Sequence, residues 1–262
     1  MFHYSRTLLK VGPRILALSL FKFSKWAKHP ERYPMALRYA TFRDISRRVS
    51  NAMQVDLHVF GLENIPADQT FMLVCNHMSA FDPLPFLMTI EKPTTFVGKM
   101  ELNKVPILKK AIKALEVESM DRDDLRQSLK VMLRVEDDLR KHNKNWMIFP
   151  EGTRIRDQLL PAAEFHHGTF RPAVKSNSLI LPAATYGTFR VLKMKPQFRK
   201  YPVYISFLKP ITPEEYASLN TADLAELTRR LIQKEVTYHL RPLDHQIMSE
   251  RKEKNYRFDQ LI

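Results

Sequence analysis

Residues 71–83 read FMLVCNHMSAFDP, and this stretch decides the fold class. Its first five residues are apolar without interruption, as in a strand that a parallel sheet buries on both faces. Asn76 and His77 end the apolar run, and Asp82 followed by Pro83 is typical of the first turn of a helix. A buried strand that leads directly into a helix is characteristic of α/β proteins, so the stretch predicts an α/β fold.

The same alternation of strand and helix extends outward from this stretch. Short apolar or alternating runs predict further strands at 55–60, 94–98, 117–120, 146–149, 179–185 and 203–207. Apolar residues at helical spacing predict helices at 105–115, 123–141 and about 221–239. We therefore expect a central mixed sheet with helices on both faces, in a domain that spans residues 55–262.

Composition excludes several classes of protein. The chain has 262 residues, of which 44% are hydrophobic, which excludes a disordered protein. It has only 6 Gly and neither of the glycine motifs that bind nucleotide phosphates, so dinucleotide and P-loop chemistry are not expected. Cys75 is the single cysteine, which excludes an intrachain disulfide and a cysteine-based zinc site and suits a reducing compartment.

Positive charge is concentrated near the N-terminus. The net charge is +14, and residues 1–60 hold 11 Lys or Arg against three acids, which gives +8 in this segment. A second basic stretch, 190–209, has six Lys or Arg and no acid. An anionic membrane surface and a nucleic acid both fit such charge. Because no nucleic-acid-binding motif accompanies it, we expect a membrane and no nucleic acid as the partner.

Residues 1–54 have no stretch that could span a bilayer. The apolar run 15–21 has seven residues, against about 20 for a spanning helix, and no cleavage site follows it. In 33–53, an apolar stripe recurs at helical spacing: Met35, Tyr39, Phe42, Ile45, Val49 and Met53. This stripe lies either in the membrane interface or on the main domain. The one-sided charge favours the interface, so we expect residues 1–54 to be a basic helical segment that docks on the membrane.

The ends of the predicted strands are where an α/β sheet places its chemistry. His77 follows the buried strand, and Asp82 lies five residues later, close enough for the loop to fold its carboxylate onto the imidazole. Such a pair suits general-base catalysis, in which the carboxylate orients the ring and stabilises its protonated form. The alternative is structural, with Asp82 capping a helix and His77 as an ordinary loop residue.

A second strand end carries residues 146–154, WMIFPEGTR. Pro150 cannot donate to a ladder, so the strand should stop there and Arg154 should reach the same edge as His77. Lys99 ends a third predicted strand at this edge. A histidine base and two cations suit an acceptor that carries both a hydroxyl and a phosphate. The alternative for Arg154 is a salt bridge, for instance to Glu151.

Four blocks of sequence now appear in order, and together they resemble the glycerolipid acyltransferase family, most closely the bacterial 1-acyl-sn-glycerol-3-phosphate (lysophosphatidic acid) acyltransferases. The blocks are NHMSAFDP at 76–83, VGKMEL at 97–102, FPEGTR at 149–154 and LPA at 181–183. The resemblance implies that His77 is the base and Asp82 its partner. It implies that the acceptor phosphate is bound by Lys99, Glu151, Gly152, Thr153 and Arg154.

The resemblance also implies a reaction. The enzyme would transfer an acyl chain from acyl-CoA or acyl carrier protein to the free hydroxyl of 1-acyl-sn-glycerol-3-phosphate, giving phosphatidic acid. It would need no metal and no cofactor, and would work as a peripheral or monotopic protein on the cytoplasmic face of the membrane. Neither Ser79 nor Cys75 is expected to be a nucleophile, and backbone N–H groups near 76–79 or 152–153 could hold the oxyanion. The alternatives are a different lysophospholipid or glycerol acceptor, or a peripheral lipid-binding protein without activity.

The sequence departs from the family pattern after Arg154. The family often has S-R-D-G and then P-F-K-K-G, whereas this chain has IRDQ at 155–158 and EFHHG at 164–168. His166 and His167 thus stand in place of two lysines. The change is either tolerated on a surface turn or reflects a different contact with the donor or acceptor.

Overall fold

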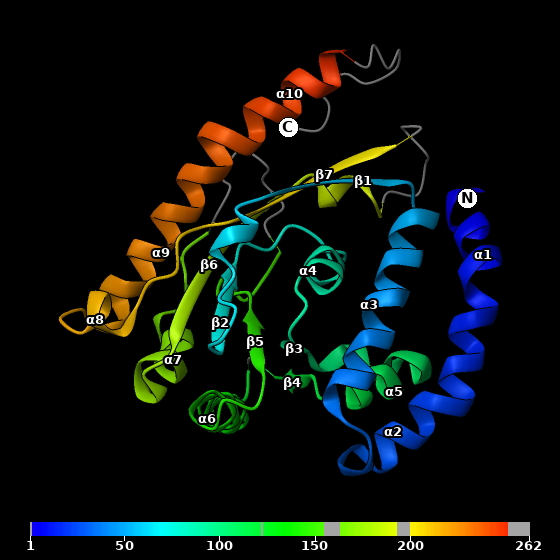
Figure 1. The fold of residues 1–262 in the computed structure, drawn as a ribbon, viewed down its shortest axis with the longest axis horizontal. Coiled ribbons are helices and arrows are strands. Elements are labelled where there is room, and N and C mark those ends of the chain that lie inside the picture. Colours follow the sequence, from blue (N-terminus) through cyan, green and yellow to red (C-terminus); the bar gives the residue numbers. More distant parts are fainter. Residues whose placement is uncertain (1, 122, 155–162, 193–199, 251–262) are drawn as a thin grey trace.

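The computed structural model describes residues 2–121, 123–154, 163–192 and 200–250, without the side chains of residues 2–8. Its centre is a sheet whose strands are ordered β1-β7-β6-β2-β5-β3-β4 (Figure 1). The strands are β1 (Val55–Phe60), β2 (Phe71–Cys75), β3 (Thr94–Lys99), β4 (Glu118–Met120), β5 (Asn145–Ile148), β6 (Leu179–Tyr186) and β7 (Tyr201–Phe207). Each predicted strand is therefore confirmed, with bounds that differ by at most two residues.

The direction of the strands brings four strand ends together. β2 runs parallel to β5 and β6, and β5 runs parallel to β3. The carboxyl ends of these four strands therefore lie at one edge of the sheet. β7 is antiparallel to β6, and β1 is parallel to β7, so the sheet is mixed, as expected.

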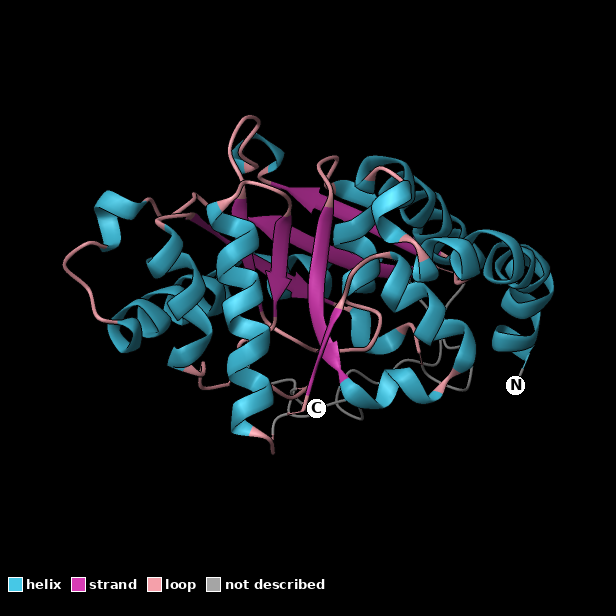
Figure 2. Ribbon diagram, turned by 90° about the horizontal axis from the view of Figure 1, so that it is seen from below, coloured by secondary structure: helices cyan, strands magenta, loops and turns pink. Residues whose placement is uncertain are grey.

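Helices cover both faces of the sheet (Figure 2). Side chains of β2 point alternately into two core clusters, so the apolar run 71–75 is a strand buried on both faces of the sheet. Met72 and Val74 face α6 (Leu125–Arg140), α7 (Arg171–Ser176) and α9 (Thr221–Glu235). Phe71, Leu73 and Cys75 face α4 (Pro83–Thr89) through Phe86.

The N-terminal segment is helical and forms one end of the molecule (Figure 1). It comprises α1 (Phe2–Leu18), a π-helical turn η1 (Ser19–Phe23), α2 (Ser24–Lys28) and α3 (Met35–Ala52). The prediction that the apolar stripe of 33–53 contacts the membrane is wrong for α3. Tyr39 is 1% and Phe42 8% exposed, because they pack in a cluster with α2, α4 and α5 (Pro106–Ala114). The stripe therefore belongs to the core, which was the alternative.

Other apolar residues of this segment face outward. Leu16, Leu20 and Phe21 are 50%, 55% and 70% exposed, whereas Phe23 and Trp26 are buried against α5. The apolar run 15–21 is thus part of a continuous helical segment from α1 through α2. Within the described residues, no helix is both long enough and apolar enough to cross a bilayer.

The remaining helices are short or lie near the C-terminus. They are η2 (Pro30–Arg32), η3 (Leu62–Asn64), η4 (Met100–Lys104), η5 (His167–Phe170), η6 (Thr188–Arg190), α8 (Pro213–Tyr216), η7 (Val236–Leu240) and α10 (Arg241–Glu250). The predicted helix 221–239 is α9 with η7, and it continues into α10. A buried bidentate ion pair between Arg190 and Asp244 fastens η6 to α10.

Candidate active site

His77 and Asp82 form the pair that their spacing predicts. Nδ1 of His77 lies 2.7 Å from Oδ2 of Asp82. The Asp82 side chain is fully buried, whereas that of His77 is 15% exposed. Because an ionised carboxylate can only accept, Nδ1 carries the proton and Nε2 keeps a lone pair. The imidazole is therefore held in the tautomer that a general base needs.

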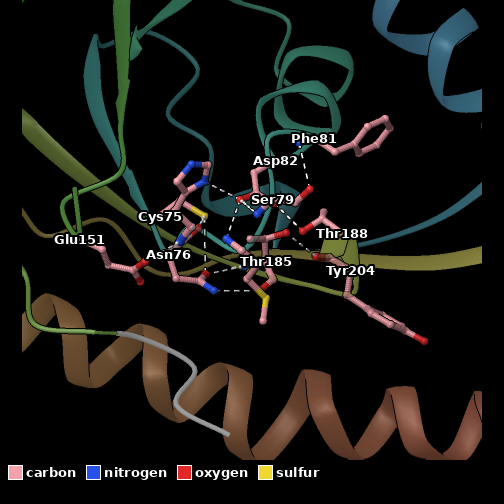
Figure 3. A network of polar contacts seen from close by, with 11 residues as sticks. Cys75, Asn76, Ser79, Phe81, Asp82, Glu151, Thr185, Thr188 and Tyr204 are labelled. Atoms are coloured by element: carbon pink, nitrogen blue, oxygen red, sulfur yellow. Dashed lines mark hydrogen bonds and ion pairs between the residues drawn. The ribbon is translucent and has the colours of Figure 1, made fainter. Parts of the chain in front are cut away.

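Asp82 is fixed by further donors (Figure 3). Its Oδ2 also accepts from the backbone N–H groups of Met78 at 2.7 Å and Ser79 at 2.8 Å. Its Oδ1 accepts from the hydroxyl of Thr188. The side chain makes no capping hydrogen bond to α4, so the helix-cap alternative is not what the structure shows. The carboxylate instead closes the 77–82 loop on the imidazole.

Thr188 is a site residue that the sequence gave no reason to select. It is fully buried in η6, directly after β6, and donates to Asp82 from the opposite side to His77. Gly187 makes this turn possible, because its φ is 88° and a Cβ there would lie 2.5 Å from the carbonyl oxygen of Pro202. A polar residue three positions after the predicted strand 179–185 is the only signal that could have pointed to Thr188.

Asn76 holds the start of the loop that carries His77 and Asp82. Its amide makes two hydrogen bonds to the backbone of Thr185 in β6, one to the carbonyl oxygen at 3.0 Å and one from the N–H at 2.8 Å (Figure 3). Asn76 is fully buried, so these bonds extend the pairing of β2 with β6 by a side chain. His77 therefore leaves the sheet at a defined position.

Residues that follow β5 hold His77 from the other side. The ring of Phe149 stacks on the imidazole, with centroids 4.3 Å apart and planes at 27°. Oε2 of Glu151 accepts from the backbone N–H of His77 at 3.1 Å, and the side chain is buried. Burial raises the pKa of Glu151 to about 9, so the carboxyl group is neutral near pH 7.

A cavity of about 900 Å³ opens in front of His77. Five of the seven predicted site residues line it: His77, Lys99, Gly152, Thr153 and Arg154. Asp82 and Glu151 are not among the lining residues and lie behind His77, in contact with its ring and its backbone. Glu151 does not pair with Arg154 in the part of the chain that the structure describes. Its carboxyl group instead accepts from backbone N–H groups, those of His77 and Ala163.

The cavity has one cationic part and one apolar part. Lys99 and Arg154 come from the ends of β3 and β5, and both are exposed. The apolar wall comes from β3, η4, β4, β5 and α6, and comprises Val97, Leu102, Met120, Leu125, Leu129, Met132 and Ile148. His166 and Arg171 also line the cavity, whereas residues 155–158 lie outside the described residues. The cavity thus suits an anionic amphiphile.

Neither Cys75 nor the backbone at 77–79 is free to react with a substrate. Cys75 is fully buried, and burial raises the pKa of its thiol well above the usual value, so it is not a thiolate nucleophile. The N–H groups of residues 77–79 are occupied by Glu151 and Asp82. The N–H of Gly152 donates to the carbonyl oxygen of Phe149. Of the predicted oxyanion donors in 76–79 and 152–153, these contacts occupy those of residues 77–79 and Gly152, whereas Thr153 lines the cavity.

Comparisons with known proteins agree on one family. The model of a family described as Acyltransferase matches residues 56–186, which is half of the chain. A 1-acyl-sn-glycerol-3-phosphate acyltransferase of Borreliella burgdorferi is 29% identical over 134 residues, covering 51% of this chain and 52% of that protein. The corresponding protein of Saccharomyces cerevisiae is 24% identical over 176 residues, covering 67% and 58%. The chain thus aligns with little more than half the length of these relatives.

A solved structure shares the whole fold. The crystal structure of the 1-acyl-sn-glycerophosphate (LPA) acyltransferase from Thermotoga maritima matches 90% of this chain and 92% of its own, with a TM-score of 0.67 and 23% sequence identity. At this identity the likeness establishes the architecture alone. The chemistry must be argued from the residues of this chain.

Proposed function

The chain belongs to the Acyltransferase family, and on that premise we propose that it transfers an acyl chain from acyl-CoA or acyl carrier protein to the free hydroxyl of 1-acyl-sn-glycerol-3-phosphate, giving phosphatidic acid. The observation that carries the proposal is the buried pair of His77 and Asp82, at 2.7 Å, beside a cavity with a cationic and an apolar part. The names of the relatives support the choice of acceptor.

The proposed reaction is a direct transfer. Nε2 of His77 takes the proton of the acceptor hydroxyl, whose oxygen attacks the thioester carbonyl. The tetrahedral intermediate collapses with loss of the donor's thiolate, which receives the proton from His77. Asp82 stabilises the imidazolium between these two steps. The N–H of Thr153 is the proposed oxyanion donor, and no metal or cofactor takes part.

Lys99 and Arg154 are the proposed ligands of the acceptor phosphate. Both are exposed cations in the cavity wall, and a guanidinium matches the geometry of a phosphate with two parallel hydrogen bonds. Gly152 and Thr153 complete this part of the cavity, and Gly152 has the positive φ of 66° that turns the chain back toward His77. Glu151 supports the site from behind, through the backbone of His77.

The proposed location is the cytoplasmic face of a membrane, with peripheral attachment through residues 1–54. Leu16, Leu20 and Phe21 are exposed on a segment rich in Lys and Arg, which suits an interface with anionic lipids. The relatives are named for a lipid substrate, so an interfacial position would bring the acceptor to the cavity.

The acceptor is tested by incubating the purified protein with a labelled acyl donor and a panel of lysophospholipids. We expect the largest kcat/KM for 1-acyl-sn-glycerol-3-phosphate and a much smaller value for monoacylglycerol. Acyl-CoA and acyl-carrier-protein donors are compared in parallel. A preference for a different headgroup would identify the acceptor and would fit the presence of His166, in place of the family's lysine, in the cavity wall. No transfer to any acceptor would contradict the proposal.

A further inference from the structure

An unpartnered apolar surface lies beside the cavity, on η4 and the first turn of α5. Met100, Val105, Ile107 and Leu108 are 39%, 47%, 36% and 42% exposed. We call these four residues the α5 rim. None of them belongs to residues 1–54, to which membrane docking was assigned, and none lines the cavity itself.

The α5 rim continues a buried stripe. Ile107 lies eight positions before Leu115, and Leu108 lies four positions before Ile112. Each pair therefore lies on one face of the helix. Ile112 and Leu115 are 8% and 2% exposed and pack against the N-terminal helices. The apolar face of α5 therefore extends beyond the core at its first turn and is left without a partner there.

The charge around the α5 rim is mainly positive. Residues 99–113 contain five lysines and one acid, Glu101. The lysines are Lys99, Lys104, Lys109, Lys110 and Lys113, and none forms an ion pair within the described residues. Exposed apolar side chains surrounded by unpaired lysines match the surface of an anionic bilayer, which has acyl chains below a layer of phosphates.

Hydrogen bonds through β4 link η4, which carries part of the α5 rim, to α6, which lines the cavity. Nδ2 of Asn103 donates to Oγ of Ser119 at 2.7 Å, and Nε2 of Gln127 donates to the carbonyl oxygen of Ser119 at 2.6 Å. These bonds join η4, β4 and α6 side by side. On α6, Leu125 and Leu129 line the cavity and are 84% and 46% exposed, so exposed apolar surface also borders the cavity at α6.

We propose that the α5 rim is a second membrane-contact surface, which holds the cavity against an anionic bilayer so that acyl chains pass from lipid to the apolar wall without entering water. The role given to the rim in catalysis rests on the proposed function, but the binding of the rim to a bilayer does not depend on that function. α5 packs directly on η1 and α2, so a membrane that contacts Leu20 and Phe21 lies next to the helix that carries the rim. A bilayer fits better than an acidic protein partner because four large apolar side chains are exposed together.

The test uses the full chain and a matched pair of double variants. Ile107→Ser with Leu108→Ser removes the apolar part of the rim. Leu227→Ser with Leu231→Ser is the control, because these leucines of α9 are 38% and 36% exposed and lie at the other end of the molecule (Figure 1). Binding is measured by co-sedimentation with vesicles of phosphatidylcholine, with and without phosphatidylglycerol. Circular dichroism confirms that each variant is folded.

We expect the rim variant to need about tenfold more anionic lipid for half-maximal binding, whereas the α9 control binds like the wild type. Lys109→Gln with Lys110→Gln should weaken binding to anionic vesicles by about tenfold or more and leave binding to neutral vesicles unchanged. Transfer to an acceptor embedded in vesicles should fall in proportion. Transfer to a short-chain acceptor that is dissolved as monomers should stay within about twofold, because the rim is not part of the catalytic machinery.

Several outcomes would overturn the proposal. The first is unchanged vesicle binding by both the apolar double variant at 107 and 108 and the lysine double variant at 109 and 110. A rate that falls only with an acyl-carrier-protein donor would identify the rim as a docking site for an acidic protein instead. A dimer that the rim variant converts to a monomer would assign the rim to a second copy of the chain. If the wild type transfers no acyl group at all, the proposed function fails, but vesicle binding still decides whether the rim contacts the membrane.

Discussion

The hydroxyl of Thr188 donates a buried hydrogen bond to Asp82, from which it is separated by 106 positions in the chain. It binds Oδ1, while Oδ2 binds the imidazole of His77. Both Thr188 and Asp82 are fully buried. The Asp82 carboxylate is therefore held on its two oxygens by the segments that follow two neighbouring strands, β2 and β6, which makes Thr188 a positioning residue for the proposed base.

Replacing Thr188 by Val should lower kcat by about tenfold, because a hydrogen bond to a buried charge is lost and the carboxylate becomes free to rotate away from His77. KM should change little, since Thr188 does not line the cavity. Steady-state kinetics with the acceptor varied gives both values.

Thr188→Ser is the matched control. It keeps the hydroxyl, so kcat should return to within about threefold of the wild type, although a methyl group is lost from a buried site. If Ser and Val lower kcat equally while both proteins stay folded, Thr188 acts through packing rather than through the bond to Asp82.

His77→Ala should abolish transfer without unfolding the protein. Removing a positioned general base typically costs about 10²–10⁴ in rate, and Asp82→Asn should be similarly severe because the amide no longer fixes the tautomer. Turnover is measured alongside circular dichroism. A folded His77→Ala protein that retains most of its turnover would exclude the proposed mechanism.

Arg154→Ala tests the proposed phosphate contact. Charge-assisted bonds to a phosphate contribute about 1.5–3 kcal/mol, so kcat/KM should fall about 10–150-fold for a phosphorylated acceptor. The fall should be much smaller for monoacylglycerol. Arg126→Ala is the control, since Arg126 is an exposed residue of α6 that does not line the cavity. Equal losses on both acceptors would show that Arg154 does not bind the phosphate.

Glu151 should make the stability of the protein depend on pH. Its pKa is about 9 in the folded protein and near 4.5 when unfolded, so between these values the folded state binds more protons than the unfolded state. The free energy of unfolding should therefore fall as pH rises, by at most about 1.4 kcal/mol per pH unit from this group.

The check is denaturant unfolding of the wild type and Glu151→Gln between pH 5 and pH 8.5. Gln keeps an oxygen that can accept from the N–H of His77 but cannot ionise, so the variant should lose this component of the slope. Parallel pH profiles for the two proteins would mean that Glu151 is ionised in the folded protein.

Membrane attachment through the N-terminal segment is tested with Leu20→Ser and Phe21→Ser together. These side chains are 55% and 70% exposed, so the change should weaken vesicle binding without disturbing the core. Leu62→Ser, at a position 52% exposed, is the control. Binding of the wild type should also weaken at 1 M salt, where the Debye length is about 3 Å. Normal binding by the double variant would place the contact elsewhere.

Point changes are preferable to deletion of residues 1–54. The deletion would remove Tyr39 and Phe42, which pack against α4 and α5, and would leave their buried neighbours exposed. Loss of binding by the truncated chain could then reflect unfolding as well as loss of the docking surface.

Much of the fold could be predicted because its signals are local. Each strand is a short apolar or alternating run, and each long helix has an apolar stripe. The pairing of His77 with Asp82 was also accessible, since five positions on a loop allow few arrangements. Residues 1–54 were predicted to be helical, but the bounds of α1 were not, because Pro13 lies inside it and its apolar run is short.

The rest depends on contacts that the local sequence does not encode. Thr188 reaches Asp82 only because β6 lies beside β2. The antiparallel direction of β7 could not be predicted, because the length of the connection between β6 and β7 does not determine its path. Glu151 was expected at the phosphate because the block at 149–154 resembles the phosphate-binding block of the family, and a sequence block does not show which of its side chains are buried. Burial keeps it neutral, so it can lie behind the base instead.

The pairing of β1 with β7 has a consequence for how the protein is made. Val55 lies opposite Tyr201, so β1 cannot pair with β7 until the ribosome has added 146 more residues. At about 5–20 residues per second, that interval is roughly 7–30 seconds. During this interval, the exposed apolar residues of the N-terminal segment have already been made, whereas the sheet still lacks β7. With the proposed attachment through residues 1–54, a nascent chain would be tethered to a membrane before its active site forms, and the protein would mature beside its proposed lipid acceptor.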